Sequence, residues 1–581
     1  MGMPEVRGRV APACRSLIVL TASVGSISVH SFGPVGGLAC DMRPARSFAT
    51  MAITPVTTGP ATSAMRSDSG KTTSLWMETA DVPAFEPLAA DATADVCIVG
   101  AGIAGLTTAY LLARAGRSVI VLDDGPIGGG ETGRTTAHLT AALDDRYFEI
   151  EQLFGDEKTR HAAESHTAAI NRVDEIVKLE HIDCDFERLD GYLFLIDGDT
   201  EETLRKELAA SHRAGLADVR MVSKAPIESF HSGPALHFPR QAQFHPLKYI
   251  SGLARAIVRD GGKIHTGSHA KEIRGGRDGE PGRVVTEDGH TVTAAHVAVC
   301  TNTPVNDWVT MHTKQAPYRT YVVAGRVPEG AVARGLYWDT GDPYHYVRLQ
   351  RASKGDTDRR DWIIVGGEDH KTGQADDMER RFESLVSWTK ARFPMVDELG
   401  LRWSGQVIEP VDFMGFIGRN PGEERLYIAT GDSGNGMTHG TIAGILIADL
   451  VQGRDNLWTA LYDPSRKPHA ISSAGEFLKE NLNVAVQYRD YVTGGEVESR
   501  EQIEPGEGAV LRRGTKKVAV YRDPKGAFHE RSAVCPHLYC IVNWNHLEKT
   551  WDCPCHGSRF DAKGKVVNGP AASDLAELEE E

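Results

Sequence analysis

Long apolar runs and a positive charge balance are both missing from this sequence of 581 residues. The best apolar candidate, SLIVLTASVGSISVH from Ser16, is interrupted by Gly, Ser and Thr. It falls short of the run of about 20 apolar residues that spans a bilayer. The formal net charge is −15, whereas nucleic acid or an anionic membrane surface would attract a basic face. We therefore expect no membrane span and no nucleic acid partner.

Acidic residues are scarce in the first 70 residues, which are rich in Gly, Ala, Ser, Thr and Pro. Five arginines stand there: Arg7, Arg9, Arg15, Arg43 and Arg46. This composition is compatible with a transit peptide, a poor signal peptide, or sequence added upstream by a wrong start codon. We expect residues 1–70 to be disordered and to lie outside the fold. The expected location is cytoplasmic, or organellar if the segment is a transit peptide.

A complete βαβ unit follows in ADVCIVGAGIAGLTTAYLLARAGRSVIVLDD, which begins at Ala94. Its glycines, Gly100, Gly102 and Gly105, allow a tight turn and let the backbone approach a pyrophosphate at the helix N-terminus. Asp123, at the end of the second strand, is placed to bind a ribose hydroxyl. A glycine-rich turn without a ligand is the alternative. The two flanking strands and the acid favour a dinucleotide site.

Three later stretches identify the dinucleotide. They are GPIGGGETGRTTAHL from Gly125, WSGQVIEPVDFMGFIGR from Trp403 and LYIATGDSGNGMTHGTIAGILIADLV from Leu426. Together with the βαβ unit they resemble the glycine oxidase and D-amino-acid oxidase family of flavoproteins, so FAD is preferred over NAD. The resemblance implies an α/β, Rossmann-like FAD-binding domain with an interleaved α+β substrate domain. The residues expected to bind FAD are Gly100, Gly102, Ile103, Ala104, Gly105, Asp123, Gly133, Arg134, Thr135, Gly431, Gly434, Gly436 and Met437.

The substrate pocket is indicated by YHYVRLQ from Tyr344, which resembles the strand that carries the family's carboxylate-binding arginine. Arg348 is therefore the candidate clamp, since a guanidinium can hold a carboxylate with two hydrogen bonds. The alternative is a strand arginine paired with a surface acid. Tyr346 and His345 are the other catalytic candidates, and Tyr344 is a further pocket residue. We expect His138 to be a polar neighbour of the flavin rather than a covalent tether.

Four cysteines and two histidines stand in two short boxes, CPHLYC at 535–540 and CPCHGS at 553–558. From Glu498 the chain reads as short strands divided by turns, which predicts a small all-β domain. The spacing Cys535-x-His537 and Cys553-x-x-His556 resembles that of Rieske domains, in which two thiolates and two imidazoles hold one [2Fe–2S] cluster. Zinc is the alternative, because Cys₂His₂ is also a zinc ligand set.

The remaining residues of the boxes refine this resemblance. Cys540 and Cys555 occupy the positions of the disulfide in Rieske proteins of cytochrome bc complexes, so the resemblance implies a disulfide here. Ser558 matches a serine that donates to a cluster sulfide, whereas Phe560 replaces a tyrosine donor. Fewer hydrogen bonds to sulfur predict a lower reduction potential. NGPA at 568–571 resembles the proline loop that covers the cluster.

The expected function is FAD-dependent oxidation of an amine or amino acid, with electrons passed singly through the cluster to an unknown acceptor. A reductase module for a separate oxygenase and a redox sensor are the alternatives. The expected domains are 91–460 for the oxidoreductase, 461–497 for a linker with a helix and 498–575 for the Rieske domain. Within the first, the nucleotide parts are about 91–145, 230–305 and 405–460, and the substrate parts about 146–230 and 306–404.

Overall fold

A computed structural model describes residues 69–196, 198–306, 311–352, 358–397, 399–467, 482–484, 486–491 and 493–578, and the backbone of two earlier strands. The chain divides into two compact units, Met1–Gly59 and Pro60–Glu581. In the first unit β1 (Ile18–Ser23) and β2 (Ser26–Ser31) pair antiparallel. The rest of the prediction for residues 1–68 lies outside the described residues. Ser69 and Gly70 belong to the fold of the second unit, where Arg134 Nη2 donates to the Gly70 carbonyl at 2.7 Å.

The expected βαβ unit is part of an eight-stranded sheet in which β9, β4, β3 and β12 run parallel. Two antiparallel strands, β11 and β10, extend this sheet beyond β12, and β19 also pairs with β12. The strands are β3 (Ala92–Val99), β4 (Val119–Leu122), β9 (Lys263–His265), β10 (Ala270–Arg274), β11 (Gly282–Thr286), β12 (Thr291–Val299), β18 (Phe416–Arg419) and β19 (Leu426–Thr430). A mostly parallel sheet of this kind places ligands at the carboxyl ends of its strands.

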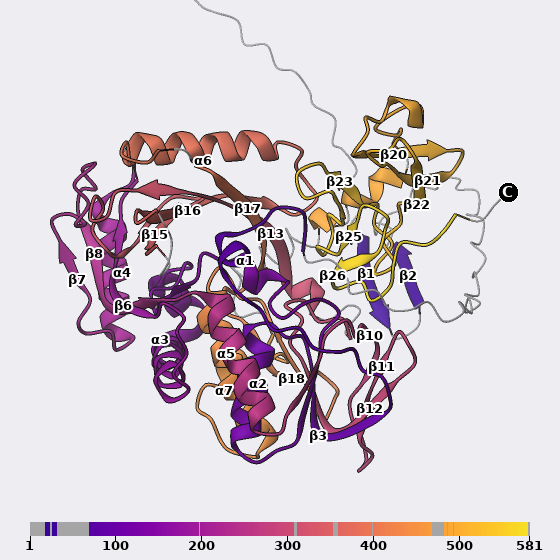
Figure 1. Ribbon diagram of the computed structural model, residues 1–581, viewed down its shortest axis with the longest axis horizontal. Helices are drawn as coiled ribbons and strands as arrows, with labels where there is room; N and C mark the ends of the chain where they lie inside the picture. The colour runs from indigo at the N-terminus through magenta and orange to yellow at the C-terminus, as the bar shows by residue number, and fades with distance from the viewer. Residues whose placement is uncertain are drawn as a thin grey trace, which may run out of the picture. The chain divides into compact units, whose positions relative to one another are not determined.

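Helices α2 (Ile103–Arg114), α5 (Pro246–Arg259) and α7 (Gly436–Val451) pack together beside this sheet (Figure 1). The close approach of α2 and α7 depends on glycine. A Cβ on Gly440 would lie 2.6 Å from the Ile103 side chain, and one on Gly444 would lie 2.5 Å from Thr107. Further helices are α1 (Leu75–Thr79), α3 (Tyr147–Leu179), α4 (Glu201–Arg213) and α8 (Thr459–Tyr462). None of the helices in the described part of the chain is long and apolar enough to cross a membrane.

A second, nine-stranded sheet is built mainly from the chain segments between the nucleotide parts. Its order is β17-β13-β16-β15-β14-β6-β8-β5, with β7 paired to β8. The strands are β5 (His138–Leu139), β6 (Glu187–Phe194), β7 (Arg220–Val222), β8 (Ala235–Gln243), β13 (Gln315–Val327), β14 (Leu336–Asp339), β15 (Tyr346–Gln350), β16 (Asp361–Lys371) and β17 (Leu401–Pro410). Helix α6 (Met378–Arg392) packs on β13 and β16 (Figure 1).

The C-terminal segment forms two small antiparallel sheets. One is β20 (Glu507–Arg513), β21 (Lys516–Arg522) and β22 (Phe528–Ser532); the other is β23 (Asn543–Asn545), β24 (Thr550–Asp552), β25 (Arg559–Asp561) and β26 (Val566–Asn568). Trp551 and Phe560 are buried between them together with the cysteines of both boxes. The expected all-β domain is thus present, and its core is built around the metal-ligand candidates.

Candidate active site and cluster site

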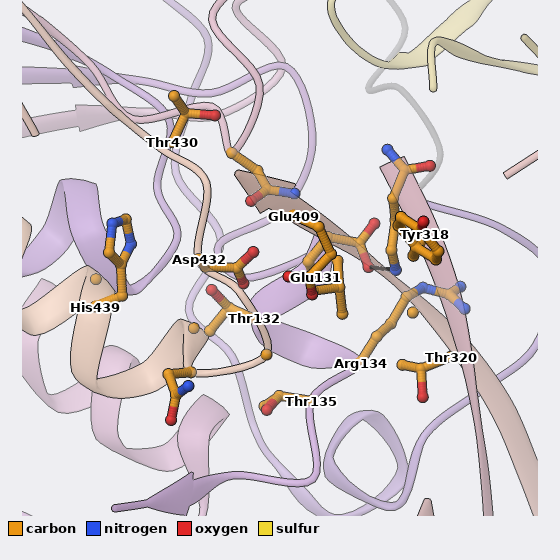
Figure 2. A pocket seen from close by; sticks show the side chains of 18 of the residues that line it. Glu131, Thr132, Arg134, Thr135, Tyr318, Thr320, Glu409, Thr430, Asp432 and His439 are labelled. Carbon is orange, nitrogen blue, oxygen red and sulfur yellow. Dashed lines mark hydrogen bonds between the residues drawn. The ribbon is translucent and has the colours of Figure 1, made fainter. Parts of the chain in front are cut away.

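A cavity of about 850 Å³ lies between the two large sheets and is lined by residues from widely separated parts of the chain. Ten of the predicted FAD-binding residues border it: Gly100, Gly102, Ile103, Ala104, Asp123, Arg134, Thr135, Gly434, Gly436 and Met437. Figure 2 shows Glu131, Glu409 and Asp432 among the other side chains that line the cavity. The volume is at the upper end for ligand sites, as a dinucleotide requires.

The nucleotide end of the cavity is formed by the first βα turn. Gly100 has φ +105°, and a Cβ there would lie 2.4 Å from the Cys300 carbonyl oxygen. Gly105 does not border the cavity; a Cβ on it would lie 1.9 Å from the Gly100 carbonyl oxygen. Asp123 accepts hydrogen bonds from the backbone N–H of Ala101, at 2.5 Å, and of Gly125, at 2.8 Å. These glycines hold the turn that leads into the N-terminus of α2, where a pyrophosphate would be stabilised.

The last turn before α7 contributes Gly434, Gly436 and Met437 to the cavity, whereas Gly431 packs behind it against Pro410. Similarly, Gly133, the glycine of the Thr-Gly-Arg loop, does not border the cavity, and a Cβ on it would be 2.6 Å from the Gly128 carbonyl oxygen. These two predicted residues therefore shape the loops rather than border the cavity. His138 borders the cavity, with Nδ1 3.0 Å from Thr136 Oγ1.

Of the predicted catalytic residues, Tyr346 borders the cavity and His345 does not. The Tyr346 hydroxyl lies 2.6 Å from Thr320 Oγ1, and the neighbouring Tyr344, which also borders the cavity, donates to Asp144 at 2.5 Å. The His345 ring stacks on Trp388 and lies 3.0 Å from Asp339 Oδ2. His345 stands just before β15, which begins at Tyr346, and its contacts separate it from the two tyrosines that flank it.

Arg348 is fully buried and does not border the cavity. Its Nη1 donates to the carbonyls of Thr136, Ala137 and Phe244 at 2.9–3.1 Å, and its Nη2 donates to Gln350 Oε1 at 2.6 Å. Burial lowers the pKa of Arg348 to about 9. The carboxylate-binding role stays a prediction. The contacts observed are those of a residue that joins two loops to β15.

The cavity wall is strongly acidic, a feature that the sequence analysis missed. Among the described residues, the only arginines or lysines that border the cavity are Arg134 and Arg146. The acids that border it are Asp123, Asp124, Glu131, Asp144, Asp145, Glu149, Asp342, Asp369, Glu409 and Asp432. Ser433 Oγ is hydrogen-bonded to both Asp145 and Glu409, the latter at 2.7 Å. Burial raises the pKa of Asp144 to about 6. Burial, and then repulsion by Asp144, raises the pKa of Asp145 to about 8.

The two cysteine and histidine boxes face each other in the C-terminal domain. Cys553 hydrogen-bonds to Cys535 and thereby lowers the pKa of that thiol. The rings of His537 and His556 have centroids 5.1 Å apart. All four side chains are at most 6% exposed. The two thiols thus lie together, and so do the two imidazoles. A cluster with one iron bound by sulfur and the other by nitrogen requires this arrangement.

The predicted disulfide Cys540–Cys555 is present, with Cα atoms 6.4 Å apart, and it joins the two boxes. These two sulfurs are therefore not available as thiolate ligands, which leaves Cys535 and Cys553. Ser558 hydrogen-bonds to Cys535, and its Oγ also accepts from the Ala571 N–H at 3.0 Å. His556 Nδ1 is buried without a hydrogen-bond partner among the described residues. A buried imidazole nitrogen of this kind fits a metal ligand.

The cluster boxes lie against the oxidoreductase part of the chain. His312, on the 3₁₀ turn His312–Lys314, has its ring centroid 4.7 Å from that of His537 and 5.9 Å from that of His556. Gln406 Nε2 donates to the Gly557 carbonyl at 3.2 Å. No local pattern could have indicated these contacts, because more than 150 residues separate Gln406 from Gly557 in the chain.

Glu548 is a second residue that the sequence analysis missed. It is buried at the turn between β23 and β24 and lies 3.4 Å from Arg134 and 3.7 Å from Arg319. It accepts from the Thr72 N–H at 2.9 Å, from Thr72 Oγ1 at 2.6 Å and from Ser404. Burial alone would raise the pKa of Glu548, but Arg134, Arg319 and Arg559 outweigh it and hold the pKa at about 2. A carboxylate of the C-terminal domain is thus bound ionically by the oxidoreductase part.

Comparison with known proteins agrees with both halves of this description. Residues 95–450 match the family described as DAO, FAD dependent oxidoreductase, and residues 495–579 match the Rieske [2Fe-2S] domain. The chain is 32% identical over 510 residues to the putative Rieske 2Fe-2S iron-sulfur protein YhfW of Bacillus subtilis, covering 87% of this chain and 97% of the relative.

Two further relatives match the oxidoreductase part. The γ-glutamylputrescine oxidoreductase of Escherichia coli is 29% identical over 411 residues, covering 68% of this chain and 91% of that protein. The crystal structure of glycine oxidase from Geobacillus kaustophilus has a TM-score of 0.53 at 18% identity, covering 65% of this chain and 99% of that one, which shows the shared fold. The cofactors are accordingly FAD and one [2Fe–2S] cluster, and the chain belongs to the DAO family of FAD-dependent oxidoreductases, with a Rieske domain at its C-terminus.

Proposed function

We propose that this protein oxidises a cationic amine and passes the electrons through its Rieske cluster to a separate one-electron acceptor. When bound, FAD supplies hydride acceptance from a C–H bond next to nitrogen, and the cluster supplies one-electron transfer. Each amine molecule oxidised releases two electrons, so two equivalents of a one-electron acceptor are consumed. The acidic wall of the cavity is the observation that carries the choice of an amine.

Three carboxyl groups of the cavity wall, those of Asp144, Asp145 and Glu409, support this choice of substrate. Asp144 is held by Tyr344 at 2.5 Å, and Asp145 and Glu409 share the Ser433 hydroxyl. An ammonium ion would be attracted by the ionised members of this group, because opposite charges interact strongly where water is partly excluded. A carboxylate substrate would be repelled by the same residues, and both terminal nitrogens of Arg348 already donate hydrogen bonds within the protein. A relative named for γ-glutamylputrescine supports an amine of the polyamine class.

The acid pKa values predict how binding depends on pH. Burial raises the pKa of Asp144 to about 6 and that of Asp145 to about 8, so these groups gain negative charge as the pH rises through this range. A cationic amine should therefore bind more tightly at pH 8 than at pH 6. The KM should fall over this interval for as long as the amine itself stays protonated.

Anaerobic mixing with a panel of amines and amino acids tests the proposal. A diamine or an acylated polyamine should bleach the flavin absorbance, whereas simple amino acids should not. In Asp144→Asn the KM for the active amine should rise by about tenfold or more, as expected for a lost charged hydrogen bond. Glu272→Gln, at an exposed acid on β10, is the matched control and should behave like wild type.

Two outcomes would overturn the proposal. If a simple amino acid bleaches the flavin and its KM is unchanged in Asp144→Asn, the protein would instead be an amino-acid oxidase. In the described part of the chain, the arginines that border the cavity and could then bind the substrate carboxylate are Arg134 and Arg146. Absence of bleaching by every compound, with flavin and cluster both present, would favour the reductase module or the redox sensor.

A further inference from the structure

The segment Asn568–Ala572 of the Rieske domain, here called the strap, runs along the cavity of the oxidoreductase part. Asn568, Gly569 and Ala571 border the same cavity as the βα turn of the nucleotide fold. Asn568 Nδ2 donates to Glu131 Oε1 at 3.1 Å. The strap is therefore bonded to the glycine-rich loop that we expect to pass beside the flavin.

The other end of the strap is bonded near the ribose end of the cavity. His269 Nε2 lies 3.0 Å from the Ala572 carbonyl oxygen, and its Nδ1 lies 3.1 Å from Asp124 Oδ2. Asp124 follows the predicted ribose ligand, Asp123, in the chain. Between the two ends the strap packs tightly on the loop after β12, since a Cβ on Gly569 would lie 2.8 Å from Val305. The contacts thus extend along one side of the cavity.

The same segment is also part of the cluster site. The Ala571 N–H donates to Ser558 Oγ at 3.0 Å, and Ser558 hydrogen-bonds to the cluster-ligand candidate Cys535. Asn568 is the last residue of β26, where it pairs with Arg559 immediately after the second box. One short segment therefore bonds to the cluster box on one side and borders the flavin cavity on the other.

We propose that the FAD site of this chain is composite and that the strap forms its outer wall. The residues of the Rieske domain that form this wall are Asn568, Gly569 and Ala571. The strap's partners on the oxidoreductase side are Glu131, His269 and Val305. FAD leaves its site only when the strap moves away. Retention of FAD thus depends on the docked Rieske domain, independently of which substrate the enzyme oxidises.

The rate of FAD release from the full-length holoprotein tests this proposal. The protein is diluted and the recovery of free-flavin fluorescence is followed, while the cluster is monitored by its own absorbance. Asn568→Ala removes the bond to Glu131 and should release FAD roughly three- to tenfold faster, the effect expected of one hydrogen bond. Asn543→Ala is the matched control, because Asn543 donates to the Gly373 carbonyl at 2.8 Å across the same domain interface but does not border the cavity.

Equal release rates in wild type and Asn568→Ala would overturn the proposal. If Asn568→Ala and Asn543→Ala both release FAD equally fast, the proposal is also overturned, because any weakening of the domain interface would then have the same effect. If Asn568→Ala loses its cluster, hydrogen exchange in the wild-type protein decides instead. The amides of the strap should exchange several-fold more slowly with FAD bound than after FAD is stripped, and unchanged exchange would refute the composite site.

Discussion

Replacing Glu548 by glutamine is predicted to loosen the docking of the Rieske domain without changing its fold. The substitution keeps the size of the side chain but removes the negative charge that lies between Arg134 and Arg319. Both arginines are almost completely buried, at 1% exposure each. They would then face each other with no carboxylate between them. Removing one partner of a buried ion pair typically costs about 3–5 kcal/mol.

The pKa of Glu548 gives an independent magnitude. It is held at about 2, against an ordinary value of 4.5, which corresponds to about 3 kcal/mol in favour of the charged form. Because the pKa in the folded protein is depressed, this stabilisation is complete above pH 4.5 and is lost as the pH falls toward 2. A loss of about 3 kcal/mol multiplies the undocked population by roughly a hundredfold.

Hydrogen exchange of the Thr72 amide reports this docking directly, since that amide donates to Glu548 Oε2 at 2.9 Å. In Glu548→Gln the peptide containing Thr72 should exchange roughly a hundredfold faster at neutral pH, because the opening free energy falls by about 3 kcal/mol. The variant should also lose the acid-dependent step between pH 4.5 and 2 that wild type contains.

The control is Glu530→Gln in the same domain. Glu530 pairs with Arg513 at 2.6 Å on the surface, where both side chains are partly exposed. Exposed pairs contribute about 0–1 kcal/mol, so exchange at Thr72 should stay at the wild-type rate. If Glu548→Gln also leaves Thr72 protected, the buried carboxylate does not hold the two domains together and the reasoning is refuted.

Three further predictions concern the cofactors and the arginine. His556→Cys should lower the reduction potential of the cluster or lose it, and a titration monitored by electron paramagnetic resonance that finds the wild-type potential would contradict the ligand assignment. Gly102→Val should give protein with little FAD, because a Cβ at 102 already lies 3.0 Å from Thr132 Oγ1; full flavin absorbance would show that the site is misplaced. Arg348→Leu leaves three carbonyls without their donor, so soluble yield and thermal stability should fall; a raised KM with unchanged stability would instead restore the carboxylate clamp.

Local chemistry decided how much of this protein could be predicted from its sequence. The turn at Gly100 and Gly102, and the boxes around Cys535 and Cys553, each place their functional atoms within a few residues. Spacing therefore indicated a nucleotide site and, through the resemblance to Rieske domains, a cluster site. The contacts of a strand side chain are not local in this sense. The match at YHYVRLQ located Arg348 correctly in a strand, but the carbonyls that occupy it come from residues 136, 137 and 244.

The interface between the domains was beyond sequence reasoning for the same reason. Glu548 and Arg134 are 414 residues apart, and neither stands in a pattern that indicates the other. The acidic wall was likewise beyond sequence reasoning, because Asp145 and Glu409 are far apart in the chain and are brought together at the Ser433 hydroxyl by the fold. Buried charges are costly unless they are paired, so the partner of a buried carboxylate can be identified only after the fold has placed both.

Arg134 explains why the two cofactor sites should be regarded as one structural unit. Arg134 borders the flavin cavity. Its guanidinium donates to the carbonyls of Gly70 and Thr72 and pairs with Glu548 of the Rieske domain. A shift of the Rieske domain must therefore move or unpair a residue of the flavin loop. The strap makes the same connection at a second place, through Asn568 and Glu131. Two independent attachments, each bonded to a cofactor loop, hold the Rieske domain against the oxidoreductase part, as the proposed passage of electrons from flavin to cluster requires.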